Sequence, residues 1–264
     1  MPFAESHHFD AVLPAGGRVD DKFAVECGQS VKAMIDFGGR SLLRRAIESV
    51  AAIEPATVGR IVVVGPRDTH NEALDYGADE ALDDTGAGSA NILRGIDWLT
   101  SFPDHAARIL IVTTDMPFIS SSAIIDFVSR CSSDVAVCVP LIERTEFESK
   151  YPGLIRTDTR LSDGWFRLGG VFLVEADLLT QHRAQLTQVF EARKNNLALA
   201  RLIGFSTLFR YLTRRLSSED IVKRAGEILS STGKVIKDAQ PELGFDIDLP
   251  EEYRYAVAQF ISHA

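Results

Sequence analysis

Side chains suited to phosphate and metal chemistry follow strand-like runs at separate places in this sequence. The first group contains two glycines, which leave the backbone accessible, and two cationic side chains. It consists of Leu13, Pro14, Ala15, Gly16, Gly17, Arg18 and Lys32. Consecutive glycines let a ligand approach the backbone, whose N–H groups can hold phosphate oxygens. Arg18 and Lys32 could then neutralise the phosphate charge. The alternative interpretation is a plain glycine turn followed by a surface lysine.

The second group consists of carboxylates. Asp115 follows the apolar run of residues 108–113, and Asp246 and Asp248 lie in a short run, 244–248, that we expect to be a strand. Magnesium in proteins takes one or two carboxylates together with phosphates and water. Alternate residues of a strand face the same side, so strand geometry does not decide whether Asp246 or Asp248 is the metal ligand. A turn or helix N-cap is the alternative role for Asp115.

The elements that would position these residues alternate along the first 140 residues. Apolar runs predict strands at 9–14, 60–65, 108–113 and 134–140, and helical spacing predicts helices at 42–52, 89–99 and 120–131. This alternation favours an α/β fold with a doubly wound, mostly parallel, Rossmann-like sheet covered on both faces. Ligands of such sheets bind outside the carboxyl ends of the strands. Asp115 and the glycine-rich segment both lie at such ends.

After residue 140 the alternation stops. We expect a strand at 167–174, helices between 187 and 229, a strand at 233–237 and a final helix from Pro250. Gly169 and Gly170 would let an acceptor molecule approach, or would mark a bulge. We therefore predict one domain over residues 1–264, with an inserted helical region at about 185–231.

The inserted region is basic within an acidic chain. The whole chain has a net charge of -9, whereas residues 185–224 contain eight basic and three acidic residues, a net charge of +5. An acidic chain argues against a general nucleic-acid binder, because such binding depends on Lys and Arg. The local positive charge favours an anionic acceptor molecule, and a solvated basic helix face is the alternative.

Composition excludes several other classes. Three scattered cysteines without a C-x-x-C pair predict neither a disulfide framework nor a zinc ribbon. No apolar run approaches the ~20 residues of a membrane span, and the first residues lack the apolar centre of a signal peptide. We expect a cytoplasmic protein without stable membrane insertion. The sequence leaves open whether the protein forms a homodimer.

Three motifs follow one another along the chain. They are Leu-x-Ala-Gly-Gly from Leu13 with Lys-Ala-x-x-x-Phe-Gly-Gly-x-x-Leu-Leu from Lys32, then Ile-Val-Thr-Thr-Asp-Met-Pro at 111–117, then Asp-Ile-Asp-Leu-Pro-Glu-Glu at 246–252. Together they resemble the MobA-like nucleotidyltransferase (NTP transferase) superfamily, over about residues 9–140 and 244–262. The resemblance implies a nucleotide-diphospho-sugar transferase type of fold. It also implies Mg²⁺-dependent transfer of a nucleoside monophosphate from an NTP to a phosphorylated or hydroxyl acceptor, with release of pyrophosphate.

The resemblance assigns roles by position. Catalytic roles fall to Lys32, Arg18 and Asp115, and nucleotide binding to residues 13–17 with Gly88 and Ser89. The resemblance implies that Asp115 shares the Mg²⁺ with Asp248 or Asp246. Asp248 is our first choice because it directly precedes the final helix. An N-cap role is the alternative for Ser89.

Departures from the family pattern keep other functions open. The family loop carries Gly-x-x-x-Arg-Met-Gly, whereas here Arg18 directly follows Gly17. The same loop contains Asp20, Asp21 and Glu26, which would repel a triphosphate if they faced it. One alternative is a catalytically degenerate nucleotide-binding protein. Another is a nucleotide-sugar-dependent glycosyltransferase, although the segment ending at Asp115 lacks the first carboxylate of that class's Asp-x-Asp.

Overall fold

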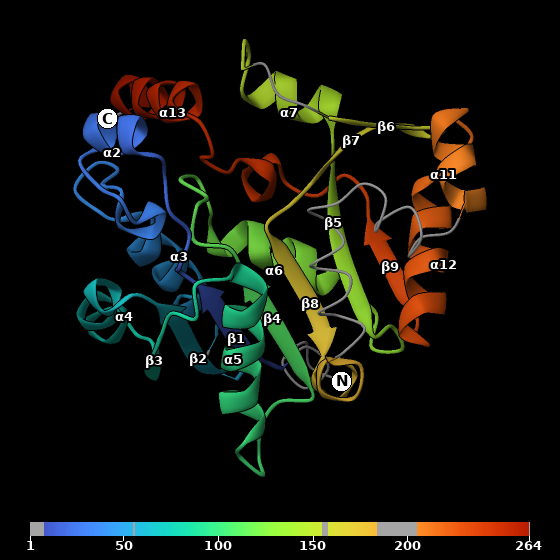
Figure 1. The fold of residues 1–264 in the computed structure, drawn as a ribbon, viewed down its shortest axis with the longest axis horizontal. Helices are drawn as coiled ribbons and strands as arrows, with labels where there is room; N and C mark the ends of the chain where they lie inside the picture. Colours follow the sequence, from blue (N-terminus) through green and yellow to red (C-terminus); the bar gives the residue numbers. More distant parts are fainter. Residues whose placement is uncertain (1–7, 55, 155–157, 184–204, 264) are drawn as a thin grey trace.

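The computed structural model describes residues 8–54, 56–154, 158–183 and 205–263, and these form one mixed sheet with helices on both faces (Figure 1). The strand order within this part of the chain is β3-β2-β1-β4-β8-β5-β7-β6, and β9 also pairs with β5. The strands are β1 (Phe9–Pro14), β2 (Val58–Gly65), β3 (Glu80–Asp83), β4 (Arg108–Val112), β5 (Val137–Glu143), β6 (Thr159–Leu161), β7 (Gly164–Leu168), β8 (Val171–Glu175) and β9 (Gly233–Ile236).

The helices connect these strands or flank them. The α-helices are α2 (Asp21–Cys27), α3 (Leu42–Ala51), α4 (His70–Asp75), α5 (Gly88–Thr100), α6 (Ser121–Ser129), α7 (Arg144–Lys150), α8 (Ala176–Gln181), α11 (Phe205–Leu212), α12 (Ser218–Leu229) and α13 (Pro250–His263). Short 3-10 turns are η1 (Lys32–Met34), η2 (Arg67–Thr69) and η3 (Pro241–Gly244). No helix of the described residues is both long and apolar enough to cross a membrane.

The parallel half of the sheet has a core on each face. Strands β1, β2, β3 and β4 run parallel, as the sequence predicts for β1, β2 and β4. Along β1, Ala11 and Leu13 pack with α3 and α6 on one face, whereas Val12 packs with α5 on the other. This alternation follows from the period-two geometry of a strand. Strand β1 is therefore buried on both faces, and the glycine-rich segment begins at its carboxyl end.

The second half of the sheet departs from the prediction. The run at 167–174 is two strands, because β7 ends at Leu168 and β8 starts at Val171. Strand β8 pairs antiparallel with both β4 and β5. The predicted strand at 134–140 begins three residues later, as β5, and alternates between buried and partly exposed residues. Apolar content alone could not reveal these pairings.

Smaller elements were also misplaced by sequence reasoning. The expected strand at 244–248 is wrong, because residues 245–249 follow η3 without helical or strand structure. The long loop after β1 contains α2, and the short, half-buried β3 was missed. The predicted strand at 233–237 and the helix from Pro250 are confirmed. Of the helical region expected at 187–229, residues 187–204 lie outside the described residues, and a break separates α11 from α12.

Asp163 holds the turn between β6 and β7 against the start of α12. Its carboxylate accepts hydrogen bonds from the Ser218 N–H (3.1 Å), the Ser218 hydroxyl (2.6 Å) and the Lys237 ammonium (2.8 Å). Partial burial disfavours the charged carboxylate, but the bonds from Lys237 and Ser218 outweigh it and lower the pKa of Asp163 to about 2.

Replacement of Asp163 by Asn should therefore lower stability in a pH-dependent manner. A depressed carboxyl pKa contributes stability above about pH 4, which is lost as the pH falls towards 2. We expect Asp163→Asn to lower the free energy of unfolding by about 1–2 kcal/mol at pH 7 and by much less near pH 2.5. Urea unfolding at both pH values checks this, with exposed Asp134→Asn as control. An equal loss at both pH values would contradict it.

Candidate active site

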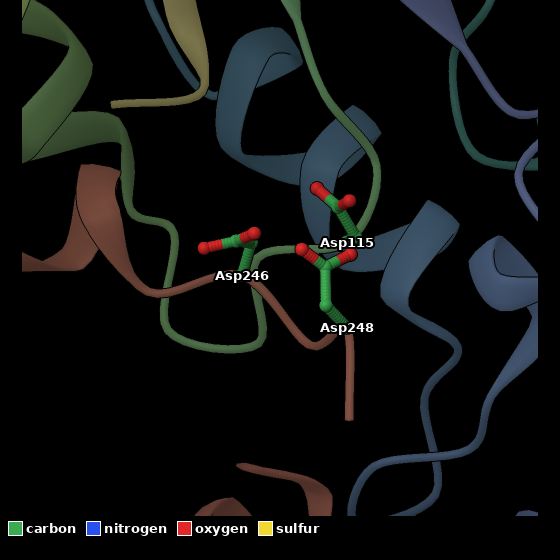
Figure 2. Close-up of side chains that lie close together, drawn as sticks. All are labelled: Asp115, Asp246 and Asp248. Carbon is green, nitrogen blue, oxygen red and sulfur yellow. The ribbon is translucent and has the colours of Figure 1, made fainter. Parts of the chain in front are cut away.

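Three carboxylates converge at the carboxyl edge of the parallel strands. Asp115 lies in the loop after β4, and Asp246 and Asp248 lie between η3 and α13. Figure 2 shows the three side chains directed towards one another, and one oxygen of each lies within 4.8 Å of the others. The sequence expectation offered Asp246 and Asp248 as alternatives, yet the structure brings both to Asp115. They meet through an irregular segment and not through a shared strand face.

Lys32 neutralises part of this negative charge. Its Nζ lies 2.5 Å from Asp248 Oδ1 and 3.5 Å from Asp115 Oδ2, and its side chain is 14% exposed. Burial opposes the charge of the ammonium group, but Asp115, Asp248 and Asp246 outweigh it and raise the pKa of Lys32. Lys32 therefore remains protonated and available to pair with an anion.

The carboxylate cluster fits a divalent cation. Among the described residues, Asp115 Oδ1 is buried and accepts no hydrogen bond. A buried oxygen left without a partner is costly, so a cation or water at this place would satisfy it. Carboxylate oxygens are the ligands that Mg²⁺ takes most readily from proteins. One ammonium group opposite three carboxylates leaves net negative charge for such an ion to balance.

The loop that carries Asp115 is fixed by contacts to β1 and β8. The Thr114 hydroxyl donates to the Pro14 carbonyl at 2.9 Å, and the Thr113 N–H donates to the Gly170 carbonyl at 2.9 Å. A Cβ on Gly170 would lie 2.3 Å from the Thr113 hydroxyl. Because Gly170 has no side chain, the loop that carries Asp115 can approach the start of β8.

Gly169 has a similar role. A Cβ at this position would lie 2.9 Å from the Leu243 carbonyl, and the Leu243 carbonyl accepts the Gly170 N–H at 2.7 Å. The two glycines therefore bring β8, the Asp115 loop and η3 together. The expectation that they admit an acceptor molecule is wrong at both positions, because the chain itself occupies that space.

The glycine-rich segment is joined directly to Lys32. The Lys32 N–H donates to the Gly17 carbonyl at 2.9 Å, and Arg18 and Val31 form an isolated antiparallel bridge. These contacts close the loop of residues 18–31 at its base. The chain therefore places Lys32 beside Gly17 although 14 residues separate them in sequence.

Comparison with known proteins identifies the family. Residues 11–202, which contain the glycine-rich segment and Asp115, match the family model described as MobA-like NTP transferase domain. The chain belongs to this family. Among curated proteins, no relative matches the sequence.

Solved structures agree with the family assignment. A hypothetical transferase from Thermus thermophilus has 27% sequence identity and a TM-score of 0.80, covering 93% of this chain and 99% of that chain. A CMP:2-keto-3-deoxy-manno-octonic acid synthetase complexed with CTP has 14% identity and a TM-score of 0.62, covering 97% of this chain and 100% of that chain. The 4-diphosphocytidyl-2C-methyl-D-erythritol synthase from Anaerococcus prevotii has 12% identity and a TM-score of 0.58, covering 96% and 98%. The last two show likeness of fold. The family match indicates a nucleotidyltransferase.

Two of the three acids of the loop, Asp20 and Glu26, have structural partners. Asp20 caps α2 by accepting the Phe23 N–H at 2.9 Å. Glu26 accepts two hydrogen bonds from Arg254 of α13, at 2.6 and 2.7 Å, and Phe23 packs on Tyr253. Asp20 and Glu26 therefore stabilise a helix packed on α13.

Arg18 lies at the start of the loop, bridged to Val31. Its side chain is exposed, and its charge acts on Asp84. Partial burial disfavours the charged Asp84, but the Asn91 amide, the Gly86 N–H and the charge of Arg18 together lower its pKa. That Arg18 neutralises phosphate charge together with Lys32 stays a prediction.

Asn91 is a residue that sequence reasoning passed over. It is fully buried in α5, donates to Asp84 at 2.6 Å and accepts from the Thr85 N–H at 2.9 Å. A Cβ on Gly16 would lie 2.4 Å from the Asn91 amide nitrogen. The sequence contained a signal for this role, because an amide side chain among apolar helix positions must satisfy its hydrogen bonds locally when it is buried.

The expected nucleotide-binding residues Gly88 and Ser89 lie at the start of α5. The helix begins at Gly88 with Ala87 as its N-cap, so the alternative N-cap role for Ser89 is wrong. Ala87 provides no side-chain cap. The first N–H groups of a helix without a side-chain cap can be satisfied by an anion. Because Asn91 contacts the Gly16 position, this helix start lies beside the glycine-rich segment.

The two adjacent glycines should respond differently to substitution. Gly16→Ala would press on Asn91 and Asp84, whereas a Cβ on Gly17 meets Lys32 Cβ at an ordinary 3.7 Å. We expect Gly16→Ala to lower the free energy of unfolding by about 1–3 kcal/mol and Gly17→Ala to change it by less than about 0.5 kcal/mol. Urea unfolding of both variants measures this. Equal losses would show that the contact with Asn91 is unimportant.

Proposed function

We propose that this protein transfers a nucleoside monophosphate from an NTP to an acceptor oxygen and releases pyrophosphate, with Mg²⁺ as cofactor. The observation that carries the proposal is the meeting of Asp115, Asp246 and Asp248 with Lys32 at the end of the glycine-rich segment. Cations for phosphate charge, free backbone N–H groups and a carboxylate cluster for a metal are the requirements of phosphoryl-group transfer.

Separate groups of residues would have separate roles in the reaction. The acceptor oxygen forms a bond to the α-phosphorus while the bond from that phosphorus to the bridging oxygen breaks, and pyrophosphate leaves. Lys32 would exchange its carboxylate partners for phosphate oxygens and stabilise their charge. The backbone at residues 13–17 and the start of α5 would hold the nucleotide. Mg²⁺ held by the three aspartates would supply further neutralisation of phosphate charge.

Pyrophosphate exchange tests this proposal. The protein is incubated with Mg²⁺, radiolabelled pyrophosphate, each of the four NTPs in turn and a panel of phosphorylated or hydroxylated acceptors. Label should enter one NTP preferentially when a usable acceptor is present, and Asp115→Asn should abolish this while leaving the circular dichroism spectrum unchanged. Failure of every NTP to acquire label, or full exchange by Asp115→Asn, would contradict the proposal. A glycosyltransferase would release a nucleoside diphosphate and leave pyrophosphate unincorporated.

Lys32 should contribute to the transition state. Lys32→Ala removes the ammonium group that faces the aspartates, and we expect a loss of about 3 kcal/mol of transition-state stabilisation, the scale of a preorganised charge partner. Steady-state kcat/KM for the NTP measures this loss. Exposed Lys22→Ala, in the same loop, serves as control. Unchanged rate and nucleotide affinity in Lys32→Ala would remove Lys32 from the site.

An anionic acceptor is the second part of the proposal. The observation that supports it is the pair of exposed cations Arg214 and Arg215 after α11, whereas Arg210 pairs with Asp220 at 2.5 Å. We expect the double change of Arg214 and Arg215 to Gln to raise the acceptor KM and leave the NTP KM unchanged. Initial rates with the acceptor varied at saturating NTP decide this. A loss confined to the NTP KM would contradict it.

A further inference from the structure

Glu252 is a buried carboxylate in the first turn of α13. It is 5% exposed, and its Oε2 accepts the N–H groups of Asp248 at 2.6 Å and Leu249 at 2.9 Å. Burial of a carboxylate is unfavourable unless hydrogen bonds stabilise the charge, and N–H groups at a helix start do so. Glu252 is thus held by the backbone that leads into the helix, and it holds that backbone in return.

These hydrogen bonds fix the backbone of the segment that carries Asp248. Residues 245–249 form neither helix nor strand, and the Asp248 side chain is 55% exposed. Three consecutive N–H groups are nevertheless bound. The Ile247 N–H donates to the Asp115 carbonyl at 2.9 Å, and the next two donate to Glu252. The position of Asp248 relative to Asp115 therefore depends on Glu252.

A second helix shows what an ordinary cap at this position achieves. In α12, Asp220 stands three residues after the N-cap Ser217 and accepts the Ser217 N–H at 2.9 Å. Glu252 stands three residues after Leu249 in α13 and accepts the corresponding N–H. The longer side chain of Glu252 also reaches one residue further back, to the Asp248 N–H. Capping alone accounts for the first bond but not for the second.

We propose that Glu252 is a positioning residue that sets the cation affinity of the Asp115, Asp246 and Asp248 cluster. The proposal rests on the proposed function, because the cation is the one named there. Glu252 acts through the backbone of Asp248. A shift of that backbone moves one carboxylate away from the other two and weakens the site that all three share.

Three variants separate positioning from capping and from charge. Glu252→Asp keeps the charge and the cap to Leu249 but loses reach to the Asp248 N–H. Glu252→Gln keeps the reach and loses the charge. Glu251→Ala, an exposed acid in the same first turn, is the control. Unfolding midpoints of all three confirm that folded protein is compared.

The readout is binding of Mn²⁺ alone, followed by electron paramagnetic resonance of the free ion. We expect Glu252→Asp to raise the Kd for Mn²⁺ about tenfold, the scale for groups that orient metal ligands. Glu252→Gln and Glu251→Ala should bind close to the wild type. Wild-type affinity in Glu252→Asp would overturn the proposal and leave Glu252 as a helix cap. Absence of Mn²⁺ binding by the wild type would instead overturn the metal site of the proposed function.

Discussion

Mutual repulsion among three aspartates is the constraint on which the site depends. Asp115, Asp246 and Asp248 present oxygens within 4.8 Å of one another at the edge of an apolar sheet. Like charges at such separations repel, and they remain together only where the surrounding structure holds them. Lys32 relieves part of the repulsion, and one oxygen of Asp115 is buried and receives no hydrogen bond from the described part of the chain. The fold thus maintains a place for positive charge that its own side chains only partly supply.

The hydrogen bonds around the cluster explain how the fold maintains it. Thr114 ties the Asp115 loop to the end of β1, and Gly170 lets that loop approach β8. Ile247 connects the C-terminal segment to the Asp115 carbonyl. Helix α13 also holds the loop helix α2 through Arg254, as Figure 1 shows for their neighbouring positions. The glycine-rich segment, the strand ends and the final helix are therefore parts of one site.

Sequence reasoning located the carboxyl ends of the parallel strands because their apolar runs are unambiguous. Asp115 and Lys32 followed from that placement together with the motifs. The partnership of Asp246 with Asp248 was only half predicted, since strand periodicity was assumed for residues that form an irregular segment. Its shape depends on long-range bonds, which no local pattern reveals.

Gly169 and Gly170 illustrate the same limit, because what a glycine makes room for is decided by tertiary contacts. Glu26 in the loop is another example, since the sequence showed its charge but not its partner Arg254.

Thermal unfolding with and without Mg²⁺ tests the central claim most directly. If repulsion among the aspartates destabilises the metal-free protein, Asp115→Asn removes one of the repelling charges and should raise the Tm in the absence of metal. Mg²⁺ should raise the Tm of the wild type and have little effect on Asp115→Asn. A lower metal-free Tm in Asp115→Asn, together with equal Mg²⁺ responses of the two proteins, would contradict the account.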